Sequence, residues 1–304
     1  MNVAIILPAR LKSTRLPDKL LLEAAGKTIL EHTLERAREA QAASKGLITR
    51  ILVAADDEKL IAIARRAGAD AVMTDPNHTS GTDRVAEAAE NLKEDVIVNL
   101  QADEPEIDPR AILLVVQQLE PISYRPIARD YKSPGPPASA LEAAPVGTLA
   151  TPIYDEEIWL KSNVVKVVID KFNRALYFSR APIPFVRDTG ARTVVHAKGA
   201  RISFSGDPGD RIALDSKGED RLIYGYHHVG IYAYRKDYLM NFEFLDTSGL
   251  ERLEMLEQLR VLYNGGTIRV GIIESNRPGI DTQADFDAFV NRFKTKSQEP
   301  GAKS

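Results

Sequence analysis

The stretch Met1–Thr28, MNVAIILPARLKSTRLPDKLLLEAAGKT, decides the fold class. Val3–Leu7 is a short apolar run, which is typical of a buried parallel strand. The loop that follows carries four cations within ten residues, namely Arg10, Lys12, Arg15 and Lys19. Open α/β sheets bind ligands at the carboxyl ends of their strands, and Arg and Lys at this density suit a polyanion such as a triphosphate. A solvated basic loop without a ligand is the alternative interpretation.

Short apolar runs and amphipathic helical patterns alternate through roughly the first 120 residues. The runs that we predict to be strands are Val3–Leu7, Arg50–Ala54, Asp70–Met73 and Val96–Leu100. The patterns that we predict to be helices are Thr28–Ala42, Glu58–Ala67, Thr82–Leu92 and Arg110–Leu119. Because parallel strands need a crossover between them, this alternation predicts an α/β fold with a mostly parallel central sheet.

The second half of the sequence has longer β-type patterns. Tyr124–Pro145 is rich in Pro and small residues, which predicts a surface excursion. Arg187–Arg221 is rich in Gly and charged residues, which predicts an insertion that is either mobile or a small ribbon. The remaining predicted strands are Gly147–Pro152, Val164–Asp170, Ala175–Ser179, His228–Tyr234 and Thr267–Ile273. The remaining predicted helices are Gln283–Phe293 and Leu250–Tyr263, the latter with Leu253, Leu256, Leu259 and Leu262 facing inward.

These patterns divide the chain into four parts. The first is an α/β half at residues 1–123, followed by the excursion at 124–145. The third is a second half at 146–293, which contains the insertion at 187–221, and the last is a frayed tail at 294–304. A length of 304 residues allows one large α/β domain or two domains, at roughly 150 residues each.

The composition excludes several classes of protein. A net charge of −3 argues against bulk nucleic-acid binding, so the basicity near the amino terminus is a local feature. The absence of cysteine excludes disulfides, thiolate zinc sites and a Cys nucleophile. The sequence has neither a signal-peptide pattern nor an apolar stretch long enough to span a membrane. We therefore expect a cytoplasmic protein without a membrane partner.

An acidic pair, Asp103 and Glu104, follows the predicted strand Val96–Leu100. Carboxylates at such a position can hold a divalent cation, and Mg²⁺ commonly takes one or two carboxylates together with substrate phosphates. Asp103 is the better candidate because it lies closer to the end of the strand. A helix-capping acid ahead of Pro109–Leu119 is the alternative.

Other candidate motifs are weaker. Gly26-Lys27-Thr28 ends like a P-loop, but Leu21 stands where that motif needs a glycine. Gly81 and Arg84 lie at a predicted strand-to-helix transition, where Gly81 would allow close backbone approach and Arg84 would reach a base or phosphate. An N-cap followed by a turn is the alternative there. The adjacent His227 and His228 point to opposite faces of a strand, so at most one enters a pocket.

Taken together, the motifs resemble the 3-deoxy-manno-octulosonate (KDO) cytidylyltransferase family, the CMP-KDO synthetases. Single segments are shared with CMP-sialic acid synthetases, whereas the LEQLR helix and the YFSR strand together are more specific to the KDO enzymes. The matching segments run nearly end to end: Ile6–Arg10, Ser13–Pro17 with Lys19, His78 with Ser80–Arg84, Val96–Gln101 with Asp103–Pro105, Val164–Asp170, Ala175–Arg180, His228–Arg235, Leu253–Leu262 and Gly279–Thr282.

The resemblance implies a Rossmann-like nucleotidyltransferase fold, a homodimer and a Mg²⁺ cofactor. It implies that CTP and KDO give CMP-KDO and pyrophosphate for lipopolysaccharide biosynthesis. It also implies that the first half of the chain binds the nucleotide, and that a smaller β-rich half binds the sugar acid and forms the dimer contact. It assigns nucleotide binding to Leu7, Ala9, Arg10, Arg15, Lys19, Ser80, Gly81, Arg84 and Gln101. It assigns Mg²⁺ to Asp103 and Asp281, which with Arg10 and Lys19 form the catalytic set, and the sugar acid to Arg180, His228, Glu257 and Gln258.

Two departures from the family pattern leave alternatives open. Ala102 stands where the family usually has Gly, and a methyl group there would shift the site if the position needs a glycine-only conformation or close approach of the ligand. The segments 124–145 and 187–221 are longer than expected, and the latter would be able to form a lid. The alternatives are a synthetase for a modified KDO, a CMP-sialic acid synthetase, and a non-catalytic nucleotide- or sugar-binding module.

Overall fold

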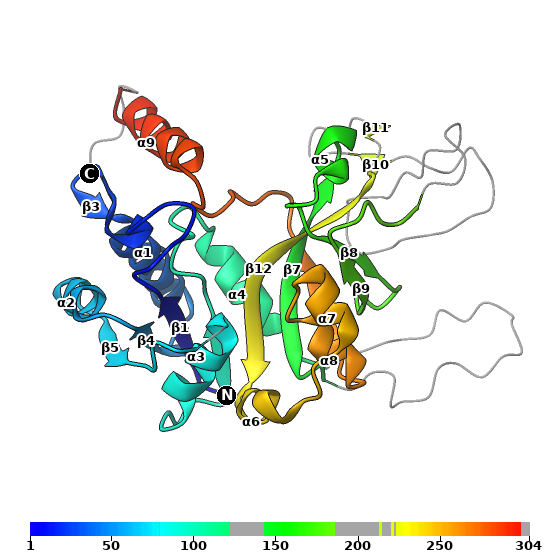
Figure 1. Cartoon of the computed structure of the whole chain (residues 1–304), viewed down its shortest axis with the longest axis horizontal. Coiled ribbons are helices and arrows are strands. Elements are labelled where there is room, and N and C mark those ends of the chain that lie inside the picture. Colours follow the sequence, from blue (N-terminus) through cyan, green and yellow to red (C-terminus); the bar gives the residue numbers. More distant parts are fainter. Residues whose placement is uncertain (79, 122–142, 186–212, 215–219, 222, 299–304) are drawn as a thin grey trace, which may run out of the picture. The chain divides into compact units, whose positions relative to one another are not determined.

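The computed structural model describes residues 1–78, 80–121, 143–185, 213–214, 220–221 and 223–298 (Figure 1). The chain forms two compact units that interleave along the sequence. Unit 1 comprises Met1–Leu114, Gly230–Glu243 and Asn276–Ser304, and unit 2 comprises Val115–Val229 and Phe244–Ser275. The functional division into halves at residues 123 and 146 stays a prediction, since these units are defined by compactness alone. No helix among the described residues is long and apolar enough to cross a membrane.

Unit 1 is built around a mostly parallel sheet, as the alternation of patterns predicts. Its central strand β1 (Val3–Ala9) pairs in parallel with β4 (Ile48–Ala55) and β6 (Val96–Asn99). At one edge, β5 (Asp70–Met73) pairs in parallel with β4, and at the other the second half of β12 (Gly225–Arg235) pairs antiparallel with β6. Neighbours on both sides explain why the run in β1 is wholly apolar: Val3, Ala4, Ile5, Ile6 and Leu7 are all 0% exposed.

The helices of unit 1 begin where the sequence supplies caps. Thr28 forms a capping box with Glu31 at the start of α1 (Ile29–Ala43), Asp57 caps α2 (Glu58–Arg66) and Ser80 caps α3 (Gly81–Ala89). Gly26-Lys27-Thr28 thus belongs to the turn and second strand of a short hairpin, in which β2 (Glu23–Ala24) pairs antiparallel with β3 (Lys27–Thr28), and to the helix cap. The other helices are η1 (Lys19–Leu21), α4 (Pro109–Gln117, which continues into unit 2), α6 (Lys236–Met240) and α9 (Gln283–Gln298).

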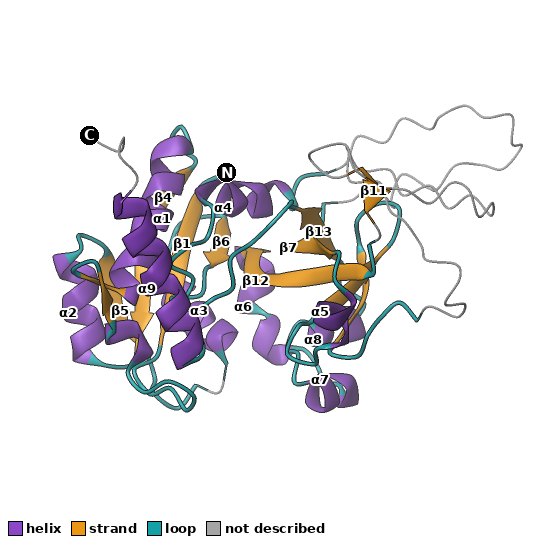
Figure 2. Cartoon of the chain, turned by 90° about the horizontal axis from the view of Figure 1, so that it is seen from above, coloured by secondary structure: helices purple, strands orange, loops and turns teal. Residues whose placement is uncertain are grey.

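The last helix packs on the first. Figure 2 shows α1 and α9 side by side, and the ring of His32 in α1 contacts the rings of Phe289 and Phe293 in α9. α9 extends to Gln298, and the fraying of the chain from Lys294 stays a prediction.

Unit 2 combines a parallel strand pair with antiparallel strands. Here β7 (Val146–Ile153) lies between β13 (Ile268–Ile272), with which it is parallel, and the first half of β12. Two of the predicted strands form a hairpin, in which β8 (Lys166–Ile169) pairs antiparallel with β9 (Ala175–Ser179). The remaining elements are α5 (Glu156–Leu160), η3 (Phe242–Phe244, at the boundary of the units), α7 (Gly249–Glu254) and α8 (Leu259–Tyr263).

The prediction of one continuous helix over Leu250–Tyr263 is wrong. Met255 adopts a left-handed conformation (φ 53°), which ends α7 and separates it from α8. Leu253 is consequently 85% exposed, whereas Leu256 and Leu259 are buried. Leucines at three-residue spacing satisfy the periodicity of one helix, and that periodicity does not reveal a turn between two short helices.

Most of the two long segments falls outside the described residues. This holds for the predicted surface excursion at Tyr124–Pro145 up to residue 142, and for most of Arg187–Arg221. Within the second segment, β10 (Ala213–Leu214) and β11 (Asp220–Arg221) form an antiparallel pair, as in the predicted small ribbon.

Gly147 in β7 gives a direct test of packing in unit 2. A Cβ atom at Gly147 would lie 2.7 Å from the carbonyl oxygen of Val115 and 2.8 Å from Cβ of Gln118, so Gly147→Ala forces the backbone apart. We expect the variant to lower the free energy of unfolding by about 1–3 kcal/mol, measured by urea denaturation. Gly230→Ala in β12 is the matched control, because nothing lies within 4 Å of the added Cβ. Equal stability of the two variants would contradict this packing.

Candidate functional site

The loop after β1 is held in place by hydrogen bonds to two other segments of unit 1. Nη2 of Arg10 donates to the carbonyl oxygen of His78 at 2.6 Å. The backbone N–H of Leu11 donates to Oδ1 of Asp56 at 2.9 Å, just after β4. Asp57 caps α2, whereas its neighbour Asp56 fixes the basic loop.

Lys19 joins the two aspartates that the resemblance assigns to the metal. Its Nζ donates to Oδ2 of Asp103, and to Oδ1 of Asp281 at 3.1 Å. Burial alone would lower the pKa of Lys19, but the charges and hydrogen bonds of Asp103 and Asp281 raise it above 10.5. Arg15 adds an ion pair to Oδ2 of Asp281 at 3.0 Å. Three segments far apart in the sequence therefore meet at one ammonium group.

Glu104 lies against this cluster as a third carboxyl group. Burial, and then the charge of Asp103, raise the pKa of Glu104 to about 8. Its Oε2 is buried and has no hydrogen-bond partner within the described part of the chain. A backbone hydrogen bond also joins the two acidic segments: the N–H of Ile280 donates to the carbonyl oxygen of Asp103 at 2.9 Å. This bond holds the segment of Asp281 against that of Asp103.

The amino-terminal end of α3 supplies a buried cation. Arg84 is 1% exposed; it donates from Nη1 to Oγ1 of Thr74 and pairs with Asp56 at 3.6 Å. Burial lowers the pKa of Arg84. Its Nη2 is the atom that faces Asp56 at 3.6 Å, and it has no hydrogen-bond acceptor among the described residues. A buried donor without a hydrogen bond is costly, so this nitrogen is well placed for a ligand atom.

These side chains surround a cavity of about 260 Å³ within unit 1. Of the predicted nucleotide residues, Arg10, Lys19, Gly81, Arg84 and Gln101 line it, as does Asp103. Its other lining residues are Pro8, Lys12, Ser13, Leu20 and Ala102.

Four further predicted residues do not line this cavity. Leu7 and Ala9 are fully buried in β1, Ser80 caps α3, and Arg15 pairs with Asp281. Lys12 is the lining cation that the resemblance did not assign, although the count of cations in this loop already included it.

Ala102 has a backbone conformation that does not require glycine. Its backbone is outside the left-handed region that favours glycine, and it is 3% exposed at the wall of the cavity. Its carbonyl oxygen accepts a hydrogen bond from Oγ1 of Thr33 in α1 at 2.9 Å. The concern that a methyl group at this position requires a shifted backbone is therefore not supported.

In unit 2, Arg180 is engaged by the main chain. Its guanidinium donates to the carbonyl oxygens of Glu254 (2.7 Å), Ser162 (3.3 Å) and Met255 (3.4 Å). The carboxylate of Glu254 in turn accepts from the backbone N–H of Arg180 at 2.8 Å and from Oγ of Ser179. Arg180 thus fixes the turn between α7 and α8, just before Glu257 and Gln258.

His228 is a buried neutral group. Its Nε2 lies 3.0 Å from Oγ1 of Thr148, and its ring packs edge-on against Phe178. Burial, and then the proximity of His227, lower the pKa of His228 to about 3. Any role in binding a sugar acid is consequently that of an uncharged hydrogen-bonding group.

The other two predicted sugar-acid residues flank the start of α8. Gln258 is 7% exposed, and its Nε2 is buried without an acceptor in the described part of unit 2. The carbonyl oxygen of Glu257 accepts a hydrogen bond from the backbone N–H of Arg260 at 3.0 Å. The structure thus brings Arg180 close to the turn that carries both residues.

Lys166 was missed by the sequence analysis. It is 0% exposed, and its Nζ donates to the carbonyl oxygens of Lys161 (2.9 Å), Val164 (2.7 Å) and Arg180 (2.6 Å). Burial lowers its pKa. A Lys in an alternating strand predicts an exposed side chain, so only the folded backbone reveals this role.

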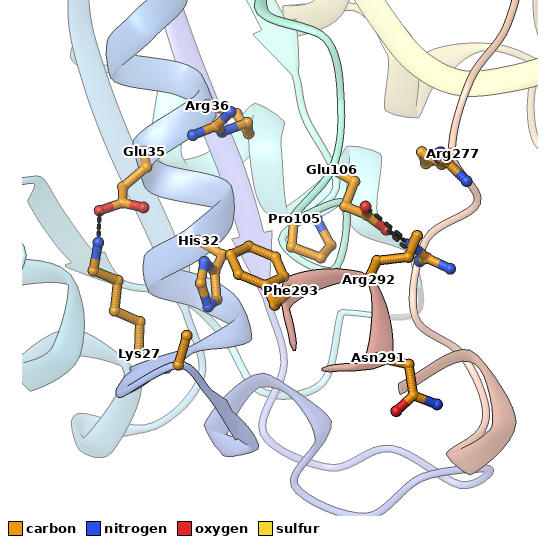
Figure 3. Close-up of a pocket in the computed structure, with 11 residues that line it drawn as sticks. Lys27, His32, Glu35, Arg36, Pro105, Glu106, Arg277, Asn291, Arg292 and Phe293 are labelled. Atoms are coloured by element: carbon orange, nitrogen blue, oxygen red, sulfur yellow. Dashed lines mark hydrogen bonds and ion pairs between the residues drawn. The ribbon is translucent and has the colours of Figure 1, made fainter. Parts of the chain in front are cut away.

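A larger cavity of about 660 Å³ lies between α1 and α9 of unit 1 (Figure 3). Its charged groups are largely paired within the protein, through Lys27–Glu35 and through a bidentate bond from Arg292 to Glu106. His32 and Phe293 form its apolar wall. The Arg292–Glu106 pair ties α9 to the loop after β6, and so supports the segment that carries Asp103.

The predicted metal ligands are two carboxylates, those of Asp103 and Asp281. Among the described residues, no group of three or more His, Asp or Glu side chains forms a metal cluster. Asp103 and Asp281 nevertheless converge on one cation, the ammonium group of Lys19. Two carboxylates fit Mg²⁺ where phosphate oxygens and water complete the octahedron.

Comparison with known proteins identifies the family. Residues 4–270 match the family described as Cytidylyltransferase. The chain is 36% identical over 294 residues to the 3-deoxy-manno-octulosonate cytidylyltransferase of Geobacter sulfurreducens, covering 97% of this chain and 100% of the relative. The chain belongs to the 3-deoxy-manno-octulosonate cytidylyltransferase family. The enzyme of that name from Geotalea daltonii is 38% identical over 296 residues, with 97% and 100% coverage.

Solved structures agree with this family. A CMP:2-keto-3-deoxy-manno-octonic acid synthetase complexed with CTP superposes with a TM-score of 0.75 at 31% identity, covering 97% of this chain and 100% of that one. A cytidylyltransferase from Leptospira borgpetersenii matches with a TM-score of 0.52 at 17% identity and supports the fold alone, with 97% and 87% coverage. The nucleotidyltransferase fold predicted from the sequence is confirmed, as is the resemblance itself.

The buried imidazole predicts how stability depends on pH. Above pH 6.5, His228 is neutral in the folded and unfolded chain and contributes nothing. Between pH 6.5 and about pH 3, the unfolded chain binds a proton at this imidazole that the folded chain does not bind. The free energy of unfolding therefore decreases as the pH is lowered from 6.5 to about 3. At pH 5 the loss in free energy of unfolding is about 2 kcal/mol, because each pH unit below 6.5 contributes roughly 1.4 kcal/mol.

Replacing the imidazole removes this term. His228→Gln keeps a polar group near Thr148 but does not titrate, so we expect its loss of stability between pH 7 and pH 5 to be smaller than that of the wild type by about 2 kcal/mol. Urea denaturation of both proteins at the two pH values measures the difference. An identical loss in both proteins would show that His228 accepts its proton at an ordinary pKa.

Proposed function

We propose that this chain transfers the cytidylyl group of CTP to 3-deoxy-manno-octulosonate, forming CMP-KDO and releasing pyrophosphate. The observation that carries the proposal is the convergence of Lys19, Asp103 and Asp281 at the edge of a cavity lined by further cations. Its position beyond the carboxyl ends of β1 and β6 is where open α/β sheets bind nucleotides. Near full-length similarity to proteins named for this reaction supports the choice of substrates.

The cations of the cavity would bind the triphosphate. Arg10 and Lys12 line it from the loop after β1, and their charge offsets the repulsion between CTP and an anionic sugar acid. Nη2 of Arg84, which makes no hydrogen bond among the described residues, would donate to the nucleotide from the lining of the same cavity. Because Asp56 and the carbonyl of His78 already fix this loop, little reorganisation is needed when the ligand arrives.

The aspartates would hold Mg²⁺. When bound there, Mg²⁺ supplies Lewis-acid stabilisation of charge on the α-phosphate and on the departing pyrophosphate. Asp103 and Asp281 orient it, and the hydrogen bond from Ile280 to Asp103 keeps the two carboxylates together. No side chain in this arrangement needs to form a covalent intermediate, because the sugar hydroxyl attacks the α-phosphorus directly.

Unit 2 would provide the sugar-acid residues. Arg180 acts first as a positioning residue, since it fixes the turn that precedes Glu257 and Gln258. The buried, unpaired Nε2 of Gln258 is a donor suited to a sugar hydroxyl or carboxylate. We propose further, from the resemblance of the motifs to the family, that the protein is a cytoplasmic homodimer that serves lipopolysaccharide biosynthesis.

Substrate choice is tested by measuring pyrophosphate release. We expect release from CTP with KDO in the presence of Mg²⁺, and at least 100-fold less with sialic acid or when EDTA removes the metal. Turnover of sialic acid or of an amino-substituted KDO at a higher kcat/KM would favour those alternatives. A folded protein that releases no pyrophosphate with any sugar acid would favour the binding module.

The role of Asp103 has its own test. Asp103→Asn removes one metal-binding charge while keeping the size of the side chain, so we expect kcat to fall at least 100-fold with little change in Tm. Asp287→Asn on the exposed face of α9 is the matched control and should keep full activity. Normal turnover of Asp103→Asn would remove Asp103 from the metal site.

A further inference from the structure

Lys19 occupies the place between Asp103 and Asp281. Its ammonium group donates to one oxygen of each carboxylate, and its side chain is only 15% exposed. A cation shared by these two aspartates therefore already exists in the chain itself. A divalent ion bound by the same two oxygens would lie next to the ammonium group, where like charges repel.

The same ammonium group has a second set of partners within reach. Lys19 lines the cavity beside Arg10 and Lys12, in which the triphosphate would lie. A Lys side chain has four rotatable bonds and donates as a point charge, so it is able to exchange one anionic partner for another. Phosphate oxygens in the cavity compete with the aspartates for this group, since both sets of atoms are negatively charged.

We propose that Lys19 couples the binding of nucleotide to the binding of the divalent cation. Without nucleotide, its ammonium group holds the two aspartates and excludes the metal ion. When a nucleoside triphosphate enters, Lys19 turns to the phosphates and releases Asp103 and Asp281 for the metal. This inference rests on the proposed function for the identity of the nucleotide, but the exclusion of the metal by Lys19 is independent of any substrate.

The order of binding follows from this exchange. The free enzyme binds divalent cations weakly, and the nucleotide strengthens metal binding by removing the competing charge. Linkage requires the reverse as well, so a bound metal ion strengthens the binding of nucleotide. Arg15 plays a smaller part, because it is 66% exposed and contacts only the second oxygen of Asp281.

The test measures Mn²⁺ binding to the nucleotide-free full-length protein by titration with electron paramagnetic resonance detection. We expect Lys19→Met to tighten Mn²⁺ binding at least 10-fold, because the competing cation is gone. Lys12→Met is the matched control: it removes the same charge from the same loop and the same cavity wall, and no ion pair joins Lys12 to a described residue. We expect its effect to stay below about 3-fold, the size of a long-range field effect.

Two results would overturn the coupling. One is unchanged or weaker Mn²⁺ binding by Lys19→Met, and the other is an equal gain in Lys12→Met, which would show only a general loss of positive charge. Lys19→Gln serves as a second variant if Lys19→Met does not fold. The Mn²⁺ titration contains neither CTP nor a sugar acid, so a negative result there does not contradict the proposed reaction. Likewise, an absence of pyrophosphate release does not contradict a difference in Mn²⁺ binding between the variants.

Discussion

The arrangement of the candidate site depends on one interaction, the ammonium group of Lys19 held between Asp103 and Asp281. Two carboxylates of like charge at one place repel each other unless a cation compensates them. The compensating ammonium group comes from the loop after β1. Asp103 lies in the loop after β6, and Asp281 lies in the segment just before α9. The charge balance therefore draws three distant segments of unit 1 together, and the site exists only when all three are folded.

The surrounding contacts keep these segments in register. Asp56 fixes the basic loop through the N–H of Leu11 and also faces the buried Arg84. The backbone bond from Ile280 to Asp103 aligns the two acidic segments, and the pair between Arg292 and Glu106 ties α9 to the loop after β6. These contacts hold the basic loop and the two acidic segments in place before any ligand arrives. Preorganisation of this kind is where most electrostatic stabilisation of a transition state originates.

The sequence predicts what depends on local pattern. The apolar runs that become β1 and β6 and the cations of the first loop are visible without coordinates. The parallel sheet follows from their alternation, and the family follows from motifs spread over the whole chain. The break at Met255 is not predictable in this way, because the leucine spacing continues across it.

Contacts between residues far apart in the sequence were also not predictable from the sequence. Asp56 looks like a helix cap in the sequence, and Lys166 looks like an exposed strand residue, yet each is bound by partners that only the fold brings near. Arg84 was expected to reach a ligand from an open helix end, and it is instead almost wholly buried with one nitrogen left free of acceptors among the described residues. Arg180 is similarly committed to backbone carbonyls before any sugar acid binds.

A crystal structure of this protein with CTP and Mg²⁺ tests the central claim most directly. The account predicts density for the triphosphate beside Arg10 and Lys12, with Nζ of Lys19 within hydrogen-bonding distance of a phosphate oxygen and the metal ion coordinated by Asp103 and Asp281. A nucleotide bound elsewhere, or a metal ion bound away from both aspartates while Lys19 still bridges them, would contradict it.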